Sequence, residues 1–218
     1  MNLELSVERQ RLDRESSVTV ADPGPKPDDH GPEQGRRHRA LVGLRAALDV
    51  EEEVRATAER AVTERATTAT WLGASLADLA TVTGRTRQAA RKRWPALGDV
   101  ARRRRWLGYH VDEVLWAARL VLEHRGAIIE SGGAPFVTRA DALERRTAEV
   151  ADGFGTQPSP TDDATARWRA LDALVDRDLR ACVEASGAPA EGMAGFAVHG
   201  AGGVVAHYDT ARRAPGPD

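Results

Sequence analysis

The sequence predicts a mainly α-helical protein. Apolar residues recur at spacings of three and four over most of the chain between residues 38 and 186, as they do along one face of a helix. Residues that favour helix N-termini stand directly before several of these stretches. Glycine and proline gather instead in residues 22–37 and beyond residue 187. We therefore expect helices in the middle of the 218-residue chain and less regular structure at its two ends.

The first 37 residues are expected to be largely flexible. Four prolines and three glycines lie among charged residues in segment 22–37. Such a segment buries too little apolar surface to offset the entropy that it loses on ordering. Before it, Leu3, Leu5 and Val7 alternate with other residues, a weak pattern that suits a short strand.

Helical periodicity begins near His38 and is clearest over residues 50–69. Val54, Ala58 and Val62 share one face of this predicted helix. Gly73 follows the helix closely and is suited to end it, because glycine adopts the left-handed conformation of a helix C-terminus at little cost.

A pair of short helices is predicted next. Ser75 is a favourable N-cap for the first helix, and Asp78 can complete a capping box with it. Gly84 allows a sharp turn because glycine tolerates a positive φ. Thr86 then caps the second helix, and Pro95 ends it. The apolar side chains expected to face inward are Leu76, Leu79, Ala80, Ala89, Ala90 and Trp94.

Charge is distributed unevenly along the chain. The formal net charge is −2, yet residues 85–105 hold nine basic residues and one acidic residue, a local charge of +8 against −10 elsewhere. Such asymmetry is typical of proteins that bind nucleic acid. The alternative is a basic surface that is simply solvated.

Residues 75–94 resemble the DNA-binding segment of bacterial helix-turn-helix proteins. The matching residues are Ala80, Gly84, the cap Thr86, the run 87–90 and Trp94. The sequence departs from the family at Thr83 and Arg85, where these proteins usually have buried apolar residues. The resemblance covers about 20 residues and implies a tri-helical helix-turn-helix domain over residues 38–108, which would place its second short helix in the major groove of double-stranded DNA.

The resemblance also implies which side chains face the DNA. Arg87 would bind guanine and Gln88 would bind adenine, each with two hydrogen bonds. Thr86 and the helix N-terminus would suit a phosphate, and Arg91 and Lys92 would bind either bases or phosphates. The further candidate DNA-binding residues are Ser75, Arg85, Arg102, Arg103, Arg104 and Arg105.

Two basic runs have two interpretations each. Residues 102–105 could contact phosphates, or they could form a solvated turn in which one or two arginines pair with acidic residues. Residues 36–39 could form an arm that enters the minor groove, or they could be solvated charge.

Residues 109–186 are expected to form a helical region that packs, dimerises or binds a partner protein. Helices are predicted over residues 111–125, from a capping box at Thr138 and Asp141 to about residue 151, and from a cap at Thr161 to about residue 186. Loops are expected over residues 130–135 and 153–160. The apolar stripe of the last helix either forms a homodimer contact or closes the core of the monomer. This stripe consists of Ala164, Trp168, Leu171, Val175, Leu179 and Cys182.

Residues 187–218 form a tail rich in glycine, alanine and proline. Residues 196–199 and 204–208 could pair as a β-hairpin around the glycines between them.

No catalytic or metal-binding pattern stands out, so we expect no enzyme activity, no cofactor and no metal. Cys182, the only cysteine, lies on an apolar stripe and is expected to be a core residue. The histidines lack a spacing typical of metal ligands. Three tryptophans at helical positions are expected to anchor the core: Trp106, Trp116 and Trp168.

The function that these observations predict is that of a sequence-specific bacterial transcription regulator. Two alternatives remain: a plasmid, phage or chromosome-organising factor with little sequence preference, and a sigma-like adaptor that needs a protein partner to touch DNA. The N-terminus lacks the apolar run of a signal peptide, and no stretch approaches the roughly 20 apolar residues of a membrane helix. We therefore expect a cytoplasmic, nucleoid-associated protein without membrane contact.

Overall fold

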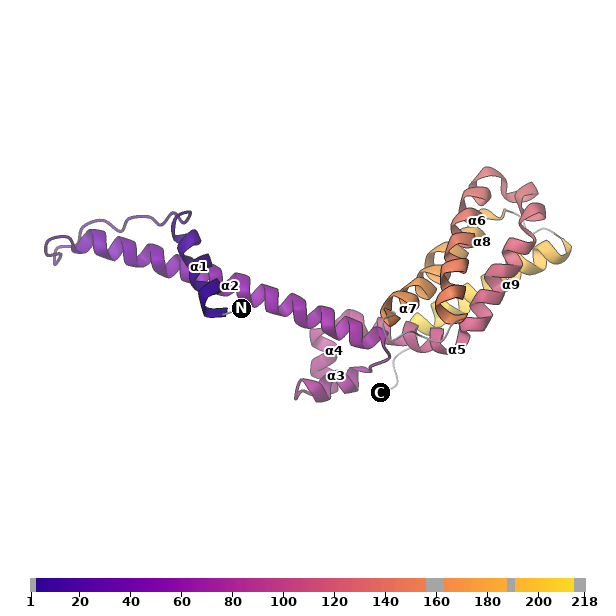
Figure 1. The fold of residues 1–218 in the computed structure, drawn as a ribbon, viewed down its shortest axis with the longest axis horizontal. Helices are drawn as coiled ribbons and strands as arrows, with labels where there is room; N and C mark the ends of the chain where they lie inside the picture. The colour runs from indigo at the N-terminus through magenta and orange to yellow at the C-terminus, as the bar shows by residue number, and fades with distance from the viewer. Residues whose placement is uncertain (1–2, 156–162, 188–190, 214–218) are drawn as a thin grey trace. The chain divides into compact units, whose positions relative to one another are not determined.

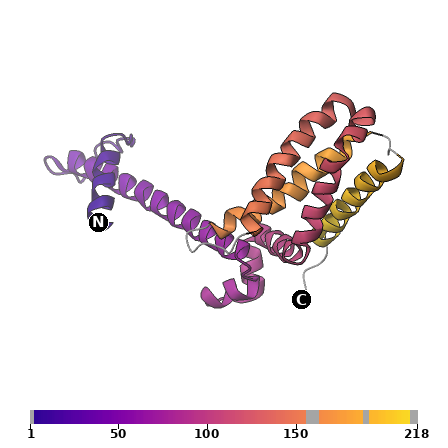
Figure 2. The same cartoon turned by 45° about the vertical axis from the view of Figure 1, so that its right-hand side comes forward.

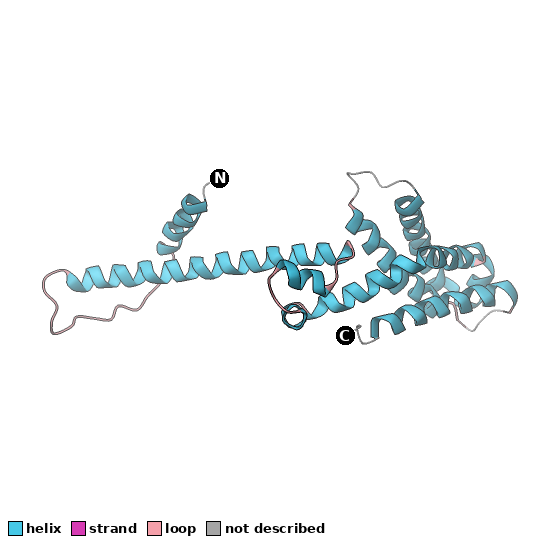
Figure 3. Ribbon diagram, turned by 90° about the horizontal axis from the view of Figure 1, so that it is seen from below, coloured by secondary structure: helices cyan, strands magenta, loops and turns pink. Residues whose placement is uncertain are grey.

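The structure is a computed structural model that describes residues 3–155, 163–187 and 191–213 (Figure 1). These residues form helices joined by turns and loops, and none of the described residues lies in a strand (Figure 3). The predicted mainly α-helical class is confirmed. None of the described helices combines the length and the apolar character that a membrane span requires.

The chain divides into two units, residues 1–64 and residues 65–218. The first unit contains α1 (Leu3–Glu15) and most of α2 (Glu33–Trp71) (Figure 1). Ala46 and Val50 of α2 are buried, and Val50 lines a small pocket together with Val7 of α1. Arg14 of α1 forms an ion pair with Glu53 of α2 at 3.0 Å.

The strand predicted for the N-terminus is wrong, because these residues form α1. Arg11 forms ion pairs with Glu8, three residues before it, and with Glu15, four residues after it. These spacings place the side chains next to one another only on a helix. The pairs therefore favour a helix over the weak alternation of apolar residues.

Residues 33–37, predicted to end a flexible segment, instead begin α2. The guanidinium of Arg37 donates to both carboxylate oxygens of Asp29, at 2.6 and 2.9 Å, and to the carbonyl oxygen of Gly24 at 3.0 Å. Arg37 is thus held by the preceding loop and is not presented as part of a minor-groove arm.

Helix α2 is continuous where the sequence predicts a separate helix over residues 50–69. Every residue from 51 to 65 is exposed. The predicted apolar face with Val54, Ala58 and Val62 is therefore exposed to solvent. The next buried residue of α2 is Ala66.

The second unit continues from the last turns of α2. Two short helices are followed by a bundle in which α5 and α9 pack along each other, α6 lies beside α5, and α7, η1 and α8 follow one another (Figure 2). The elements are α3 (Leu76–Val82), α4 (Arg87–Arg93), α5 (Pro95–Glu123), α6 (Arg125–Gly155), α7 (Ala164–Ala173), the π-helical segment η1 (Leu174–Leu179), α8 (Arg180–Ala185) and α9 (Gly192–Arg213).

The apolar stripe of the predicted last helix closes the core of this unit. Leu171, Val175 and Leu179 have no exposed surface, and Cys182 has almost none. A homodimer contact through this stripe is therefore wrong. Trp168 is only half-buried, and the Thr161 predicted as the helix cap lies outside the described residues. The observed cap is Asp163, whose Oδ1 accepts hydrogen bonds from the N–H groups of Thr165 and Ala166.

The predicted hairpin is wrong, because residues 192–213 form α9. The buried residues of this segment recur at helical spacing, and its glycines allow close packing. A Cβ on Gly202, for example, would lie 3.7 Å from a methyl group of Val183. The sequence of this segment therefore had the apolar periodicity of a helix, although its glycines suggested a turn. The buried residues are Ala194, Ala197, Ala201, Val204, Val205 and Tyr208.

The predicted boundaries of the middle helices also change. Helix α5 begins at Pro95 and bends at His110, where the sequence predicts a helix only from residue 111. The predicted loop 130–135 is a kink inside α6 at Gly133, which has a φ of +59°. Thr138, predicted in a capping box, therefore lies inside α6.

The tryptophans are not all core residues as predicted. Trp106 is buried, but Trp116 is 49% exposed and contacts the ring of Phe196 at a centroid distance of 6.3 Å. Helix α5 thus leaves about half of the Trp116 side chain in solvent.

Candidate nucleic-acid interface

Helix α3 begins with the predicted capping box, which is confirmed. The Ser75 hydroxyl oxygen accepts a hydrogen bond from the Asp78 N–H at 3.2 Å, and Asp78 Oδ2 accepts one from the Ser75 N–H at 2.8 Å. The Ser75 N–H and the Ser75 hydroxyl both donate to Asp78 Oδ2, and these two hydrogen bonds hold the pKa of the Asp78 carboxyl below its usual value. The Ser75 side chain thus has a structural role at the helix start.

The turn between α3 and α4 depends on Gly84, which has a φ of +61°. The Arg85 N–H donates to the Ala80 carbonyl across this turn at 2.9 Å. Thr83, which departs from the helix-turn-helix pattern, donates its hydroxyl hydrogen to the Leu79 carbonyl at 2.9 Å. A polar residue is tolerated at this position because its hydroxyl is satisfied within α3.

A Gly84→Ala substitution tests this turn. A side chain at positive φ costs about 1–2 kcal/mol, so we expect the free energy of unfolding to fall by that amount. The measurement is urea unfolding followed by tryptophan fluorescence, because all five tryptophans lie in residues 65–218. Gly126→Ala is the matched control. Gly126 has an ordinary φ and open space around its Cα, so alanine there should be neutral or stabilise by up to about 1 kcal/mol.

Helix α4 is capped and packed as the sequence predicts. The Thr86 hydroxyl oxygen accepts a hydrogen bond from the Ala89 N–H at 3.2 Å. Ala90 is fully buried, and Trp94 at the helix end is 6% exposed. Ala89 is only half-buried. The small side chain of Ala90 allows α4 to lie close to α3, and it fixes which side of α4 faces outward.

The predicted DNA-facing side chains of α4 are exposed, but they divide into two groups. Gln88 and Lys92 lie about 200° around the helix from buried Ala90, and so they point away from the protein. Arg87 and Arg91, one turn apart, line a pocket that α4 shares with α5. The four residues together span an arc of about 140° on α4, with the pocket at the Arg87 edge and Lys92 at the other edge.

The predicted basic run 102–105 lies on α5, not in a turn. A helix directs successive residues to different sides, so the four arginines have different surroundings. Arg102 donates from Nε to the Arg212 carbonyl at 2.8 Å, and its Nη2 lies 3.7 Å from Asp99. Arg105 is exposed and forms no ion pair with another described residue. The run is thus no uniform phosphate-binding patch.

Arg103 has a structural role, which favours pairing with acidic residues over the predicted phosphate contact. Its Nη1 donates to Asp172 at 2.5 Å. Its Nε lies 3.0 Å from Asp99, although not in hydrogen-bonding geometry, and the guanidinium lies over the Trp71 ring. The alternative prediction, that one or two of these arginines pair with acidic residues, holds for Arg102 and Arg103.

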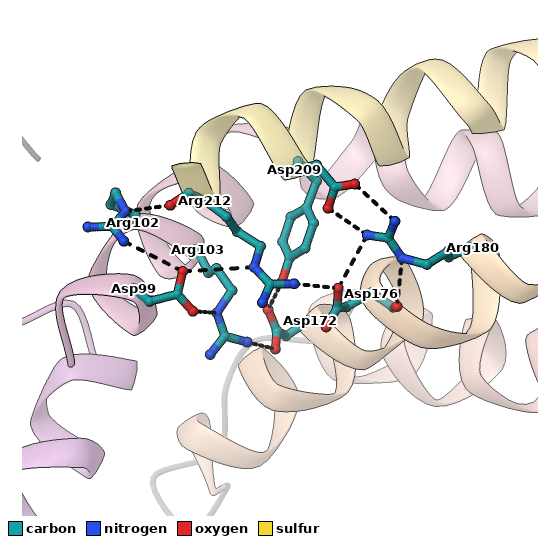
Figure 4. Close-up of polar contacts among 9 residues, drawn as sticks. Asp99, Arg102, Arg103, Asp172, Asp176, Arg180, Asp209 and Arg212 are labelled. Atoms are coloured by element: carbon teal, nitrogen blue, oxygen red, sulfur yellow. Dashed lines mark hydrogen bonds and ion pairs between the residues drawn. The ribbon is translucent and has the colours of Figure 1, made fainter. Parts of the chain in front are cut away.

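An ion-pair network continues from Arg103 through α7, η1, α8 and α9 (Figure 4). Asp172 also accepts a hydrogen bond from the Tyr208 hydroxyl at 2.5 Å. Burial raises the pKa of Asp172, and the bonds from Tyr208 and Arg103 oppose that shift. Arg180 and Arg212 both pair with Asp176, and Arg180 pairs with Asp209. The network joins the helices of the bundle to the start of α5.

Arg104 is the one member of the run that is half-buried without a carboxylate partner among the described residues. Its Nε donates to the Trp71 carbonyl at 2.9 Å, and its guanidinium carbon lies 3.3 Å from the centre of the Trp168 ring. Burial, together with the nearby charge of Arg167, lowers the pKa of Arg104. The charge of an anion beside this guanidinium would oppose this decrease, because it favours the protonated form.

The pocket next to Arg104 has a volume of about 430 Å³. It is formed by the end of α2, the turn before α3, and parts of α3, α4, α5 and α7. Its lining residues are Thr70, Gly73, Ala74, Ser75, Leu76, Arg87, Arg91, Gly98, Ala101, Arg102, Arg104, Arg105, Gly108, Tyr109 and Trp168.

Cys182 lies in the core, and two of the histidines contact aromatic rings. Burial raises the pKa of the Cys182 thiol to about 12, which makes it a poor nucleophile. His110 stacks on Trp106 at a centroid distance of 4.2 Å, and His207 meets both rings edge-on. Within the described residues, no group of three or more potential ligands could hold a metal ion.

Several residues of the pocket and of the network have no role in the sequence predictions. Gly98, Gly108 and Tyr109 lie three to seven positions from the predicted Arg105, so helical periodicity of α5 could have placed them on its side of the helix. Asp172 offers no such signal, because its partners lie on helices distant in the sequence.

Comparison of the chain with protein families, with curated proteins and with solved structures finds no match in any of the three.

Proposed function

We propose that this protein binds double-stranded DNA in a sequence-specific manner as a bacterial transcription regulator. The observation that supports the proposal is the exposed side of α4 with Gln88 and Lys92, on a helix positioned by its Thr86 cap and its buried Ala90 and Trp94. In this proposal, α3 and α4 are the two helices of the helix-turn-helix motif, and α4 is its recognition helix.

The proposed contacts follow from where the side chains point. A major groove about 12 Å wide accepts a helix, and Gln88 can form two hydrogen bonds with an adenine edge. Lys92, one turn later on the same side, would bind a base or a phosphate. Arg85 and Arg87 flank the helix start, where they would contact the phosphate backbone and fix the register of the protein on the duplex.

Selection of binding sites from random duplex DNA tests this proposal. We expect the wild-type chain to enrich one motif. Gln88→Ala should weaken binding about 5–100-fold and relax the preference at one position, because a bidentate base contact is worth about 1–3 kcal/mol. Lys92→Ala should reduce the affinity for all sequences and lower the salt dependence by about one phosphate contact if Lys92 binds the backbone.

Arg119→Ala is the matched control, because Arg119 is an exposed arginine farther along α5, outside the pocket. It should enrich the same motif as the wild type. Strong, salt-sensitive binding without an enriched motif would instead support the DNA-organising alternative. An absence of binding at low salt that a protein partner restores would support the adaptor alternative, and an absence that no partner restores would overturn DNA binding altogether.

A palindromic motif would indicate a homodimer, since two-fold pairing of proteins is mirrored in the site. The contact between the copies would then involve a surface other than the buried stripe of Leu171, Val175 and Leu179.

A further inference from the structure

The pocket between α4 and α5 has the size and the residues of a small-molecule site. Its volume of about 430 Å³ falls within the roughly 300–1,000 Å³ of such sites. It contains both apolar and basic surface: Leu76 and Trp168 contribute apolar atoms, and five arginines contribute guanidinium groups. Of the described residues that line it, none is acidic. A ligand with negative charge would therefore meet attraction without a competing carboxylate in the wall.

The arginines approach the pocket from two helices. Arg87 and Arg91 lie on α4, and Arg102, Arg104 and Arg105 lie on α5. Two parallel N–H groups of a guanidinium match the geometry of a phosphate, and such charge-assisted bonds are about twice as strong as neutral ones.

Arg104 is the best-positioned of these groups. Its Nε is held by the Trp71 carbonyl and its plane by the Trp168 ring. Its two Nη groups make no hydrogen bond to any other described residue. The guanidinium is therefore oriented in advance while its outer donors remain open to an anion.

Gly108 of α5 leaves space for an arginine head, because a Cβ on this residue would lie 3.0 Å from Nη1 of Arg104. A Cβ on Gly98 would only make ordinary van der Waals contact with Nη1 of Arg102, at 3.6 Å. At position 108, even alanine would press on the guanidinium. The lack of side chains here is consistent with a site that has to accommodate guanidinium groups and a ligand together.

One aromatic ring lines this pocket while remaining open. Tyr109 is 83% exposed, whereas Trp168 is already covered by the guanidinium of Arg104. An exposed tyrosine ring beside a cluster of cations suits a planar ring that is attached to an anionic group, because the ring can stack while the anion binds arginine.

We propose that this pocket binds a small phosphorylated ligand that carries a planar ring, with a nucleoside diphosphate as the simplest example. Arg91, Arg104 and Arg105 hold the phosphates, and Tyr109 stacks on the ring. The ligand would contact both α4 and α5, and α4 is the helix proposed to read DNA. The test of ligand binding does not depend on the proposed DNA binding, because it is carried out without DNA.

Calorimetric titration of the full chain with ADP and with pyrophosphate tests this site. We expect saturable binding of both probes. Arg105→Ala and Arg91→Ala should each weaken both probes at least about tenfold, the loss expected for one charged hydrogen bond. Tyr109→Ala should weaken ADP but leave pyrophosphate unchanged, because pyrophosphate has no ring. All three residues are exposed, so the variants should unfold at the same urea concentration as the wild type.

Arg119→Ala serves again as the control and should bind both probes like the wild type, because Arg119 lies outside the pocket. The proposal is overturned if neither probe binds the wild type with a Kd below about 1 mM, equivalent to about −4 kcal/mol. It is also overturned if Arg105→Ala and Arg91→Ala bind both probes like the wild type.

A DNA-binding measurement on the same variants separates the two sources of phosphate. If Arg105→Ala weakens DNA binding while no free phosphate compound binds the wild type, the pocket holds the DNA backbone and the small-ligand proposal fails. If ADP binds and DNA does not, the ligand site stands and the proposed DNA function fails.

Discussion

Replacing Asp172 with alanine is expected to lower the free energy of unfolding of residues 65–218 by about 3–5 kcal/mol, the range for removing one partner of a buried ion pair. The Asp172 and Arg103 side chains are 13% and 17% exposed. Without the carboxylate, Arg103 keeps its charge with only Asp99 beside it, and the buried Tyr208 hydroxyl loses its acceptor. Most of the lost stability therefore comes from Arg103 and the Tyr208 hydroxyl, which stay buried without their partner.

Urea unfolding followed by tryptophan fluorescence measures this effect, and two variants separate its causes. Tyr208→Phe removes only the hydroxyl and should cost about 0.5–1.5 kcal/mol. The double variant Arg103→Met/Asp172→Leu removes both charges and should be more stable than Asp172→Ala alone, because no buried charge is left without its partner. A cost below about 1 kcal/mol for Asp172→Ala would show that water or Asp99 already neutralises Arg103.

Trp94→Ala is expected to destabilise the same unit by about 3–5 kcal/mol, the usual cost of truncating a buried tryptophan. Trp94 is 6% exposed and lies where α4 ends and α5 begins. Its ring therefore helps to fix α4 against the rest of the unit. We also expect loss of any sequence-specific DNA binding, since α4 would no longer be held in one orientation.

Trp116→Ala is the matched control because it removes the same side chain from a partly exposed site. Trp116 is 49% exposed, so its removal should cost no more than about half as much as the Trp94 truncation. Equal costs for the two variants would mean that Trp94 is not an anchor of α4. Fluorescence of the four remaining tryptophans reports unfolding in either variant.

Local patterns predicted the elements whose cause lies within a few residues. The capping box of Ser75 and Asp78, the turn at Gly84 and the cap at Thr86 each depend on hydrogen bonds or a φ angle inside one short stretch. Ala90 and Trp94 were predicted to face inward because one turn of helix separates them. The same local reasoning was wrong for α9. It interpreted the glycines of this segment as the turn of a β-hairpin, whereas they allow close packing of a helix.

The candidate site, too, was predictable from the sequence only in part. Its arginines can be found in the sequence, but four consecutive arginines on α5 look alike there. Only packing distinguishes Arg103, paired with Asp172 from α7, from Arg105, which is exposed beside the pocket. It likewise turns Arg91 toward α5 while leaving Lys92 on the outer side of α4.

The sequence by itself determined that this chain is helical, where α3 and α4 begin, and which segment concentrates positive charge. Those properties follow from backbone preferences, capping and periodicity, all of which act over a few residues. The tertiary structure alone decided which charges are neutralised and which surround the pocket. Those outcomes depend on helices distant in the sequence, such as α5, α7 and α9, whose approach sets the distances between charges.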